Sequence, residues 1–112
     1  MADCVFCEVA AGRTPARIVL DDENVVAFED IDPQAPVHVL VVPRRHLSDA
    51  REVTADGLLE SLFRAAHAVA RDKGVGESGY RLVFNVGRDA GQAVDHAHLH
   101  VLGGRGMRWP PG

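Results

Sequence analysis

The stretch DHAHLHVLGGR, residues 95–105, places a histidine at every second position. Side chains alternate between the two faces of a strand, so an extended conformation puts His96, His98 and His100 on one face. The other face is then apolar, as on a half-buried strand, and consists of Ala97, Leu99 and Val101. Half of the 6 histidines of the chain therefore share one strand face, which indicates a functional group rather than a solvated polar surface.

The spacing of these histidines argues against one shared metal ion. A strand rises about 13 Å over four residues, which is near the limit that one ion with bonds of about 2 Å can bridge. We therefore expect a division of labour between a structural site at one end of the row and histidines that remain free as imidazoles. Free imidazoles titrate near neutral pH and can act chemically there.

Composition limits the class of protein. The chain has 112 residues, of which 46% are hydrophobic and 25% charged, as is typical of a single globular domain spanning 1–112. A formal net charge of -4 provides no basic surface for a nucleic-acid duplex, so any bound nucleotide is expected to be small. The segment VHVLVVP (37–43) is too short to span a membrane, and MADCVFCEVA (1–10) lacks the pattern of a signal peptide. We expect a cytoplasmic protein with no membrane partner.

Both cysteines of the chain lie in the motif Cys4-x-x-Cys7. In a reducing compartment this spacing is typical of a redox pair or of half a zinc site, which histidines would complete. A redox pair normally follows a strand, whereas only three residues precede Cys4. From spacing alone, a zinc site, a redox pair and inert thiols all remain open.

The rest of the chain predicts an α+β fold with a five-stranded antiparallel sheet and one long helix. Apolar residues at helical spacing predict the helix over 54–73, with Thr54 capping its start and Gly74 ending it. Hairpin-length connections favour antiparallel pairing of the strands. Besides the histidine strand, the expected strands are 17–20, 25–28, 37–43 and 80–87.

Four ordered motifs resemble the histidine triad (HIT) nucleotide-binding proteins of the Hint branch: DIDPQAPVHVLVVPRRH, NVGRDAGQ, HAHLHVLGGR and MRWPPG. The resemblance extends from Cys4 to the C-terminus, and the closing tail favours the Hint-like phosphoramidases over the dinucleoside polyphosphate hydrolases of the same superfamily. It implies a HIT-like fold, a two-fold homodimer and hydrolysis of purine nucleoside phosphoramidates, which releases AMP or GMP and an amine. The long helix and Trp109 give the dimer some independent support.

The same resemblance implies three catalytic histidines. His98 matches the nucleophile, which attacks the α-phosphorus and forms a nucleotidyl-histidine that water then hydrolyses. His100 and His38 match residues that contact the phosphate oxygens. Taken alone, His38 lies among the apolar residues of its strand and would be interpreted as a buried structural histidine.

Substrate contacts are also implied by the resemblance rather than by spacing. Asn85, Gly91 and Gln92 match groups that position the phosphate, and Asp30 matches the carboxylate that binds the ribose hydroxyls. The apolar wall for the base corresponds to Phe6, Val9 and Ile31. Without the resemblance, Asp30 would be interpreted as a residue at the end of a hairpin and Asn85 as a turn former.

Some members of the family bind zinc through a CxxC motif, the histidine that ends a Pro-basic-basic-His segment, and the first histidine of the triad. These positions are Cys4, Cys7, His46 and His96 in this chain. The resemblance therefore implies a structural zinc ion that fixes the N-terminus to the sheet and takes no part in the reaction.

One position departs from the family pattern: Ala93 stands where many Hint-type proteins have a serine whose hydroxyl helps the leaving amine. Protonation of the leaving group must then come from His38, His100 or water, which predicts slow turnover of poor leaving amines. Two other functions stay open, namely a hydrolase with a catalytic zinc on His98 and His100, and a nucleotide-binding regulatory or scaffold protein.

Overall fold

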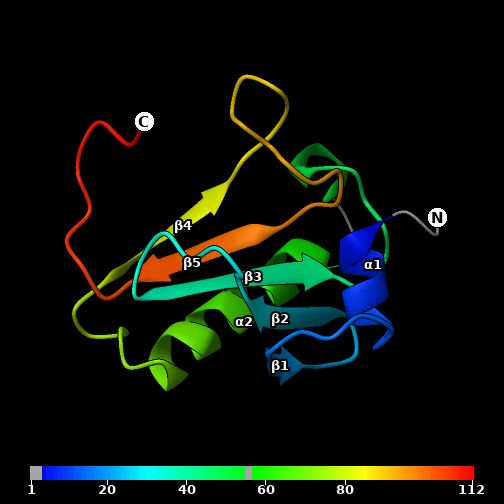
Figure 1. The fold of residues 1–112 in the computed structure, drawn as a ribbon, viewed down its shortest axis with the longest axis horizontal. Helices are drawn as coiled ribbons and strands as arrows, with labels where there is room; N and C mark the ends of the chain where they lie inside the picture. Colours follow the sequence, from blue (N-terminus) through cyan, green and yellow to red (C-terminus); the bar gives the residue numbers. More distant parts are fainter. Residues whose placement is uncertain (1–3, 55–56) are drawn as a thin grey trace.

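Five strands form an antiparallel sheet in the order β1-β2-β3-β5-β4 (Figure 1). The computed structural model describes residues 4–54 and 57–112. The strands are β1 (Ile18–Asp21), β2 (Val25–Glu29), β3 (Val37–Pro43), β4 (Tyr80–Phe84) and β5 (Leu99–Gly103). Together with one long helix, this sheet confirms the α+β fold that the sequence predicts.

The hairpin between β1 and β2 is closed by a side chain. Asp22 Oδ1 accepts hydrogen bonds from the backbone N–H groups of Asn24 and Val25, at 2.9 and 3.0 Å. An aspartate closes a turn in this way because its short side chain reaches the backbone two residues later. Strand β2 then continues to Glu29, so Asp30 is the first residue beyond its end.

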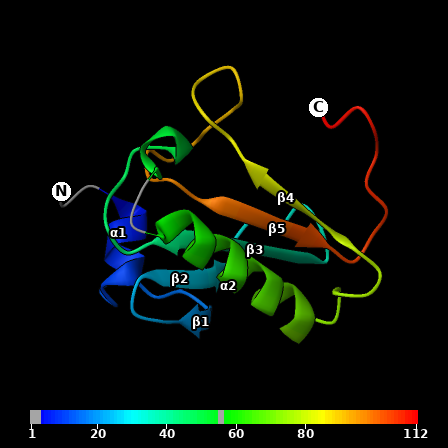
Figure 2. The same ribbon diagram turned by 180° about the vertical axis from the view of Figure 1, so that it is seen from behind.

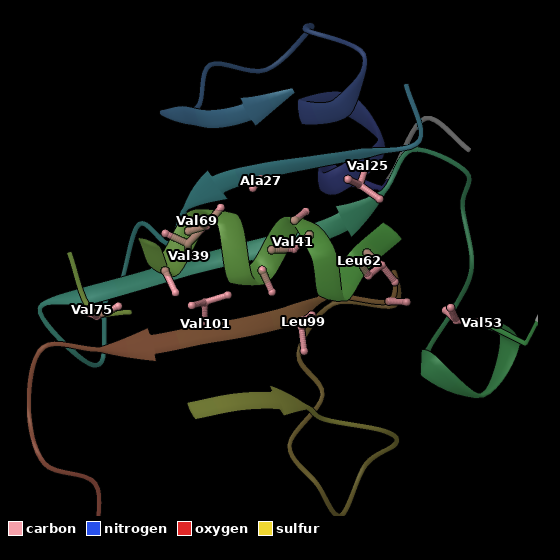
Figure 3. Packing of buried hydrophobic residues seen from close by; sticks show 14 residues of the cluster. Val25, Ala27, Val39, Val41, Val53, Leu62, Val69, Val75, Leu99 and Val101 are labelled. Atoms are coloured by element: carbon pink, nitrogen blue, oxygen red, sulfur yellow. The ribbon is translucent and has the colours of Figure 1, made fainter. Parts of the chain in front are cut away.

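Helix α2 (Leu58–Asp72) covers one face of the sheet, as the view from behind shows (Figure 2). Its buried side chains pack against inward-facing residues of the central strands (Figure 3). The helix contributes Leu62, Ala65, Ala66, Val69 and Ala70 to this core. Removal of this apolar surface from water, at about 25 cal/mol per Å², stabilises the fold. The opposite face of the sheet remains available for polar side chains.

The two ends of α2 give different outcomes for the sequence predictions. The N-cap is Gly57, with φ 69°, so the predicted cap at Thr54 is wrong, and the predicted helical residues 55–56 lie outside the described residues. The helix starts later because Gly57, in the left-handed conformation, directly precedes its first residue, Leu58. At the other end Gly74 has φ 81°, and its N–H donates to the Arg71 carbonyl at 3.1 Å. Glycine favours this left-handed conformation at a helix end, and the predicted end is confirmed.

A short helix, α1 (Val5–Ala10), lies on the face opposite α2, and the sequence pattern did not predict it. Cys4 is its N-cap, and Cys4 Sγ accepts a hydrogen bond from the Cys7 N–H at 3.3 Å. Its buried residues join a second core made of Phe6, Val9, Val26, Phe28, Leu40 and Val42. Helix α1 therefore carries the CxxC motif to the sheet face that also bears the histidines.

Strand β5 is shorter than the histidine pattern predicts, because it begins at Leu99. Its partner β3 ends at Pro43, which has no N–H to continue the ladder. The Ala97 N–H donates instead to the carbonyl of Leu47, at 2.7 Å. The first two histidines of the motif thus lie in the segment that leads into β5. The apolar side of the motif still faces the core beneath α2, as predicted, through Ala97, Leu99 and Val101.

Strand β4 also stops earlier than predicted, at Phe84 rather than at Gly87. A loop begins there, and the Gln92 side chain closes it by accepting the Gly87 N–H at 2.9 Å.

In the part of the chain that the structure describes, no helix has the length and apolar character needed to cross a membrane.

Candidate active site

Three histidines meet on the sheet face opposite α2. His38 comes from β3 and His100 from the neighbouring β5, while His98 immediately precedes β5. The rings of His98 and His100 have centroids 4.9 Å apart, and His38 Nε2 lies 2.9 Å from His100 Nδ1. We call these residues the triad cluster. His38 and His98 are buried, and His100 is partly exposed.

The hydrogen bonds of His38 fix the proton positions in this cluster. His38 Nδ1 accepts the backbone N–H of Gln34 at 3.0 Å, so a neutral His38 carries its proton on Nε2. That proton is donated to His100 Nδ1 at 2.9 Å. A neutral His100 must then carry its own proton on Nε2. Asn85 Nδ2 lies 3.5 Å from this nitrogen, and because both groups are then donors they do not bond to each other and both can reach a ligand oxygen. The hydrogen bonds from Gln34 to His38 and from His38 to His100 therefore orient the Nε2–H group of His100 toward Asn85.

His98 has the opposite arrangement of its ring nitrogens. His98 Nδ1 lies 2.7 Å from the carbonyl oxygen of His96, to which only a protonated Nδ1 can donate. The Nε2 atom of neutral His98 therefore carries a free lone pair. Phe6 packs edge-on against the ring, with centroids 5.2 Å apart and planes at 80°. The backbone and α1 together hold an unprotonated imidazole nitrogen beside His100.

Burial favours the neutral forms of His100 and His38. It lowers the pKa of His100 to about 4, with further lowering by His98 and His38 and a smaller opposing effect of Asp30. Burial also lowers the pKa of His38, against the carboxylates of Asp30 and Asp32, which raise it. A His100 with this pKa is almost entirely uncharged at neutral pH. It can serve as a hydrogen-bond donor, but at neutral pH it is a poor general acid because so little of it is protonated.

The residues expected to position a phosphate differ in whether their side chains are already hydrogen-bonded within the protein. Asn85 lies against His100, as described above, and its side chain is available to a ligand. The side chain of Gln92 is occupied, since it accepts the Gly87 N–H and donates to the carbonyls of Ser48 and Val94, at 2.8 and 3.0 Å. Gly91 has φ 81° in the same loop. Gln92 thus holds the loop in shape through these three hydrogen bonds.

The residues expected to bind the nucleoside lie at the β2–β3 side of the cluster. Asp30 Oδ2 is 3.4 Å from His38 Nε2, and Asp30 Oδ1 accepts the Asp32 N–H at 2.8 Å. Ile31 is 99% exposed, whereas Phe6 and Val9 are only 8% and 6% exposed. Ile31 can therefore touch a ligand over its whole side chain, whereas Phe6 and Val9 lie in the second core.

A second group of side chains lies at the other end of the histidine motif, and we call it the thiol cluster. It consists of Cys4, Cys7, His46 and His96, whose ligand atoms all lie within 4.8 Å of one another. His96 Nδ1 is 3.2 Å from Cys4 Sγ and 3.5 Å from Cys7 Sγ. His46 Nδ1 is 3.3 Å from Cys7 Sγ.

The donor atoms of the thiol cluster fit a tetrahedral zinc ion. Two sulfurs and two imidazole nitrogens are a common structural zinc set, and the separations match the edges of such a tetrahedron. His96 Nε2 lies 2.8 Å from the Pro43 carbonyl, to which it donates its proton, so Nδ1 carries a lone pair toward the sulfurs. Burial and then the neighbouring Cys4 raise the pKa of Cys7 in the absence of an ion. Binding of a cation would release the thiol protons.

Some groups that shape the site have no signal in the sequence. The backbone N–H of Gln34 and the carbonyls of Pro43 and His96 select the tautomers of the three buried histidines. Any residue type supplies these backbone groups, so only the fold reveals them. Helix α1, which packs Phe6 on His98, was missed because six residues are too few for a helical period.

Comparison with known proteins gives the family of the chain. The model of the HIT domain matches residues 11–107. An uncharacterised HIT-like protein of Synechocystis sp. is 45% identical over 112 residues, covering 98% of this chain and 97% of that protein. The chain belongs to the HIT family, and the family predicted from its motifs is confirmed.

Solved structures agree with this assignment. A HIT family hydrolase from Legionella pneumophila has a TM-score of 0.94 and 48% identity, covering 98% of this chain and 100% of that chain. A zinc-bound histidine triad family protein from Mycobacterium smegmatis has a TM-score of 0.82 and 33% identity, covering 93% of this chain and 76% of that one. The fold is therefore one that HIT family hydrolases share.

Proposed function

We propose that this protein hydrolyses purine nucleoside phosphoramidates through a covalent nucleotidyl-histidine on His98, releasing AMP or GMP and an amine. The observation that carries the proposal is the 2.7 Å hydrogen bond between His98 Nδ1 and the His96 carbonyl. It leaves the Nε2 lone pair free beside His100. A neutral imidazole nitrogen attacks phosphorus readily, and the covalent intermediate divides one difficult displacement into two easier ones.

The reaction balances in two steps. His98 Nε2 attacks the α-phosphorus, the new P–N bond forms, and the P–N bond to the amine breaks. The amine leaves with the electron pair and takes a proton from water. A water oxygen then attacks the phosphorus, the electron pair of the histidine P–N bond returns to Nε2, and a proton is released to solvent. One water molecule is consumed, and His98 is restored.

His100 stabilises the negative charge that shifts onto the phosphate oxygens. Its Nε2–H is the donor that faces the side of Asn85, and donors fixed in advance at such a position lower the barrier. His38 acts through His100, because its Nε2–H keeps the His100 proton on the side of the substrate. A pKa of about 4 makes His100 a poor proton source at neutral pH, so the leaving amine takes its proton from water.

The same tautomers argue against a catalytic zinc ion at the triad cluster. Among the described residues, the groups close enough to share an ion there are Asp30, His38 and His100, without His98. His38 Nδ1 already accepts the Gln34 N–H, so its Nε2 is protonated and offers no lone pair. A metal ion would first have to displace this bond and the one that His38 Nε2–H donates to His100 Nδ1.

In the proposed complex, the ribose hydroxyls donate to Asp30 and the purine lies against Ile31. Asp30 offers Oδ2 for this purpose, since Oδ1 is engaged by the Asp32 N–H and the proton on His38 Nε2, 3.4 Å from Oδ2, is directed at His100. The 99% exposure of Ile31 fits a side chain that a ligand covers. The net charge of -4 fits a small nucleotide held by local contacts rather than a polynucleotide.

We also propose that the thiol cluster holds a structural zinc ion. Cys4, Cys7, His46 and His96 would be its ligands, and the ion would fix α1 to the segment before β5. Its chemistry is that of a cross-link and does not touch the substrate. Two free thiols are typical of a reducing compartment, in keeping with a cytoplasmic location.

A two-fold homodimer belongs to the same proposal. Within residues 4–54 and 57–112, strand β4 pairs with β5 alone, so its outer edge offers unpaired backbone groups. Leu59 on α2 is 47% exposed and Trp109 in the tail is 82% exposed, so both offer apolar surface to a partner. A second copy of the chain would cover both the strand edge and these side chains.

Hydrolysis of adenosine 5′-phosphoramidate tests the proposal. We expect the wild type to release AMP, and His98→Ala to lower kcat by at least about 10³-fold while bound zinc and Tm are unchanged. His67→Ala removes an exposed histidine outside the site and serves as the matched control. Tight AMP binding without any turnover by the wild type would contradict the proposal and favour a regulatory nucleotide-binding protein.

A further inference from the structure

The loop between β2 and β3, residues 30–36, supplies the backbone group that sets the proton of His38. The N–H of Gln34 donates to His38 Nδ1 at 3.0 Å. The four loop residues 31–34 are exposed, so this part of the backbone gains little from apolar packing. A segment with few buried contacts depends on specific hydrogen bonds to stay in one conformation. The contacts that hold Gln34 therefore bear on the protons of the triad cluster.

An arginine far away in sequence provides such a contact. Arg105 Nε and Nη2 both donate to the Gln34 carbonyl, at 3.3 and 3.0 Å. The third guanidinium nitrogen, Nη1, donates to the Gly106 carbonyl at 3.0 Å and so ties the group to its own segment. Hydrogen bonds from a charged donor are stronger than neutral ones. Within the loop, Gln34 Nε2 also donates to the Asp32 carbonyl at 2.9 Å.

The turn after β5 brings Arg105 to the loop. Val37, the first residue of β3, lies opposite Gly103, the last residue of β5, so the loop and the turn meet at one end of the sheet (Figure 1). Gly104 follows with φ 90°, and a Cβ built there would lie 2.9 Å from Pro36 Cβ. Glycine alone tolerates both this conformation and this close approach. Gly104 thus lets the segment that carries Arg105 pack directly on the loop.

The proton of a neutral His38 responds to two neighbours. Asp30 Oδ2 lies 3.4 Å from His38 Nε2 and favours a proton there. The Gln34 N–H occupies Nδ1 and excludes a proton from that nitrogen. If the Gln34 backbone moves away, Nδ1 can take the proton. His38 Nε2 then no longer donates to His100, and the proton of His100 is no longer confined to its Nε2.

From these contacts we infer that Arg105 is a positioning residue: by holding the Gln34 backbone, it keeps the proton of His38 on Nε2 and that of His100 on the side of the substrate. The inference rests on the proposed function. Arg105 acts on the reaction only through the loop and takes no part in the bond changes. Its contribution is to preorganise the donor that stabilises charge on the phosphate oxygens.

Nitrogen NMR of the histidine rings tests this directly, because protonated and unprotonated ring nitrogens differ strongly in ¹⁵N chemical shift. In zinc-loaded wild type at neutral pH, we expect a protonated Nε2 and an unprotonated Nδ1 in His38. Arg105→Ala should move the two shifts toward each other and speed hydrogen exchange of the Gln34 amide about fivefold, the size of one hydrogen bond. Arg105→Lys, which keeps one charged donor, should lie in between.

Two further variants separate a local effect from general destabilisation. Gly104→Ala keeps the arginine but places a Cβ against Pro36, so it should shift the His38 nitrogens in the same direction. Arg71→Ala removes an exposed arginine on α2, and its spectra should match those of the wild type. For adenosine 5′-phosphoramidate, kcat should fall about threefold in Arg105→Ala. KM should change less, because the Asp30 N–H is held by the His38 carbonyl at 3.0 Å.

The spectra and the kinetics distinguish the two proposals. Unchanged His38 shifts in Arg105→Ala would overturn the inference, whatever happens to kcat, and so would a wild type with its His38 proton on Nδ1. Shifts that move as expected while kcat stays at the wild-type value would also overturn it and leave the hydrolase intact. If the wild type hydrolyses nothing, the proposed function fails, and the shifts still decide whether Arg105 controls the proton of His38.

Discussion

In both the thiol cluster and the triad cluster, a backbone carbonyl binds one ring nitrogen of a histidine, but it binds a different nitrogen in each. In the thiol cluster, His96 donates Nε2–H to the Pro43 carbonyl, so that Nδ1 faces two sulfurs. In the triad cluster, His98 donates Nδ1–H to the His96 carbonyl, so that Nε2 is free beside another histidine. Histidines two residues apart thus offer different nitrogens. The roles proposed for them follow from which nitrogen the backbone occupies, because the free nitrogen is the proposed zinc ligand in His96 and the proposed nucleophile in His98.

The largest expected difference between the two clusters comes from removing one candidate zinc ligand from the thiol cluster alone. Cys4→Ser keeps a side chain that can cap α1, since serine is a favoured N-cap residue, but it removes a thiolate ligand. We expect bound zinc to fall from one ion per chain to none. At zinc concentrations of about 100 Kd, the free energy of unfolding should fall by about 2.7 kcal/mol. Metal analysis and urea unfolding, with and without zinc, check this.

His98→Ala is the matched variant for that experiment, because it should retain zinc and its stabilising effect. Loss of zinc in His98→Ala but not in Cys4→Ser would contradict the division between the two clusters. It would favour a metal ion in the catalytic centre instead.

A smaller effect is expected at Ala93, at the triad end. Ala93→Ser introduces a hydroxyl where the family pattern has one that assists the leaving amine. A general acid contributes about 10²-fold or more, and water already supplies part of this, so we expect a gain of about tenfold for amines of high pKa. The gain should disappear for good leaving groups. Steady-state kinetics across a series of amines measures it, and equal rates in the two proteins would exclude this role.

A pH dependence of stability is also expected, and it belongs to the triad cluster. Burial lowers the pKa of His100 from 6.5 to about 4, so the unfolded chain binds the proton first as the pH falls. The free energy of unfolding should therefore decrease from pH 6.5 down to about pH 4, with no contribution from this residue above that range.

His100→Asn should make this dependence shallower. Urea unfolding of both proteins between about pH 7 and pH 4.5, with zinc removed from each, compares the slopes. Parallel profiles for the two proteins would mean that His100 is not neutral through that range.

Much of the fold could be predicted from local patterns. The run VHVLVVP predicted β3 with its observed bounds, Val37–Pro43, because a continuous apolar strand ends where proline interrupts the ladder. The α2 stripe predicted its body and its end, but Thr54 is not its cap. Helix α1 could not be predicted, because its six residues are stabilised by packing on the second core rather than by a period of their own.

The candidate site was predictable in its residues but not in its atoms. The alternating histidines and the CxxC motif indicated two kinds of site, and the structure brings together Cys4, Cys7, His46 and His96 at one and His38, His98 and His100 at the other. Which nitrogen is free depends on backbone groups far away in sequence, such as the Pro43 carbonyl. The predicted three-histidine strand was also too long, because β3 stops at that proline.

The central claim is that His98 becomes covalently nucleotidylated, and trapping that intermediate tests it most directly. We would mix the wild type with excess adenosine 5′-phosphoramidate, quench at alkaline pH within the first turnovers, and map the modified peptide by mass spectrometry. We predict an adenylyl group on His98, and none in His98→Ala. Turnover that proceeds with His98 unmodified, or with the adenylyl group on another residue, would contradict the claim.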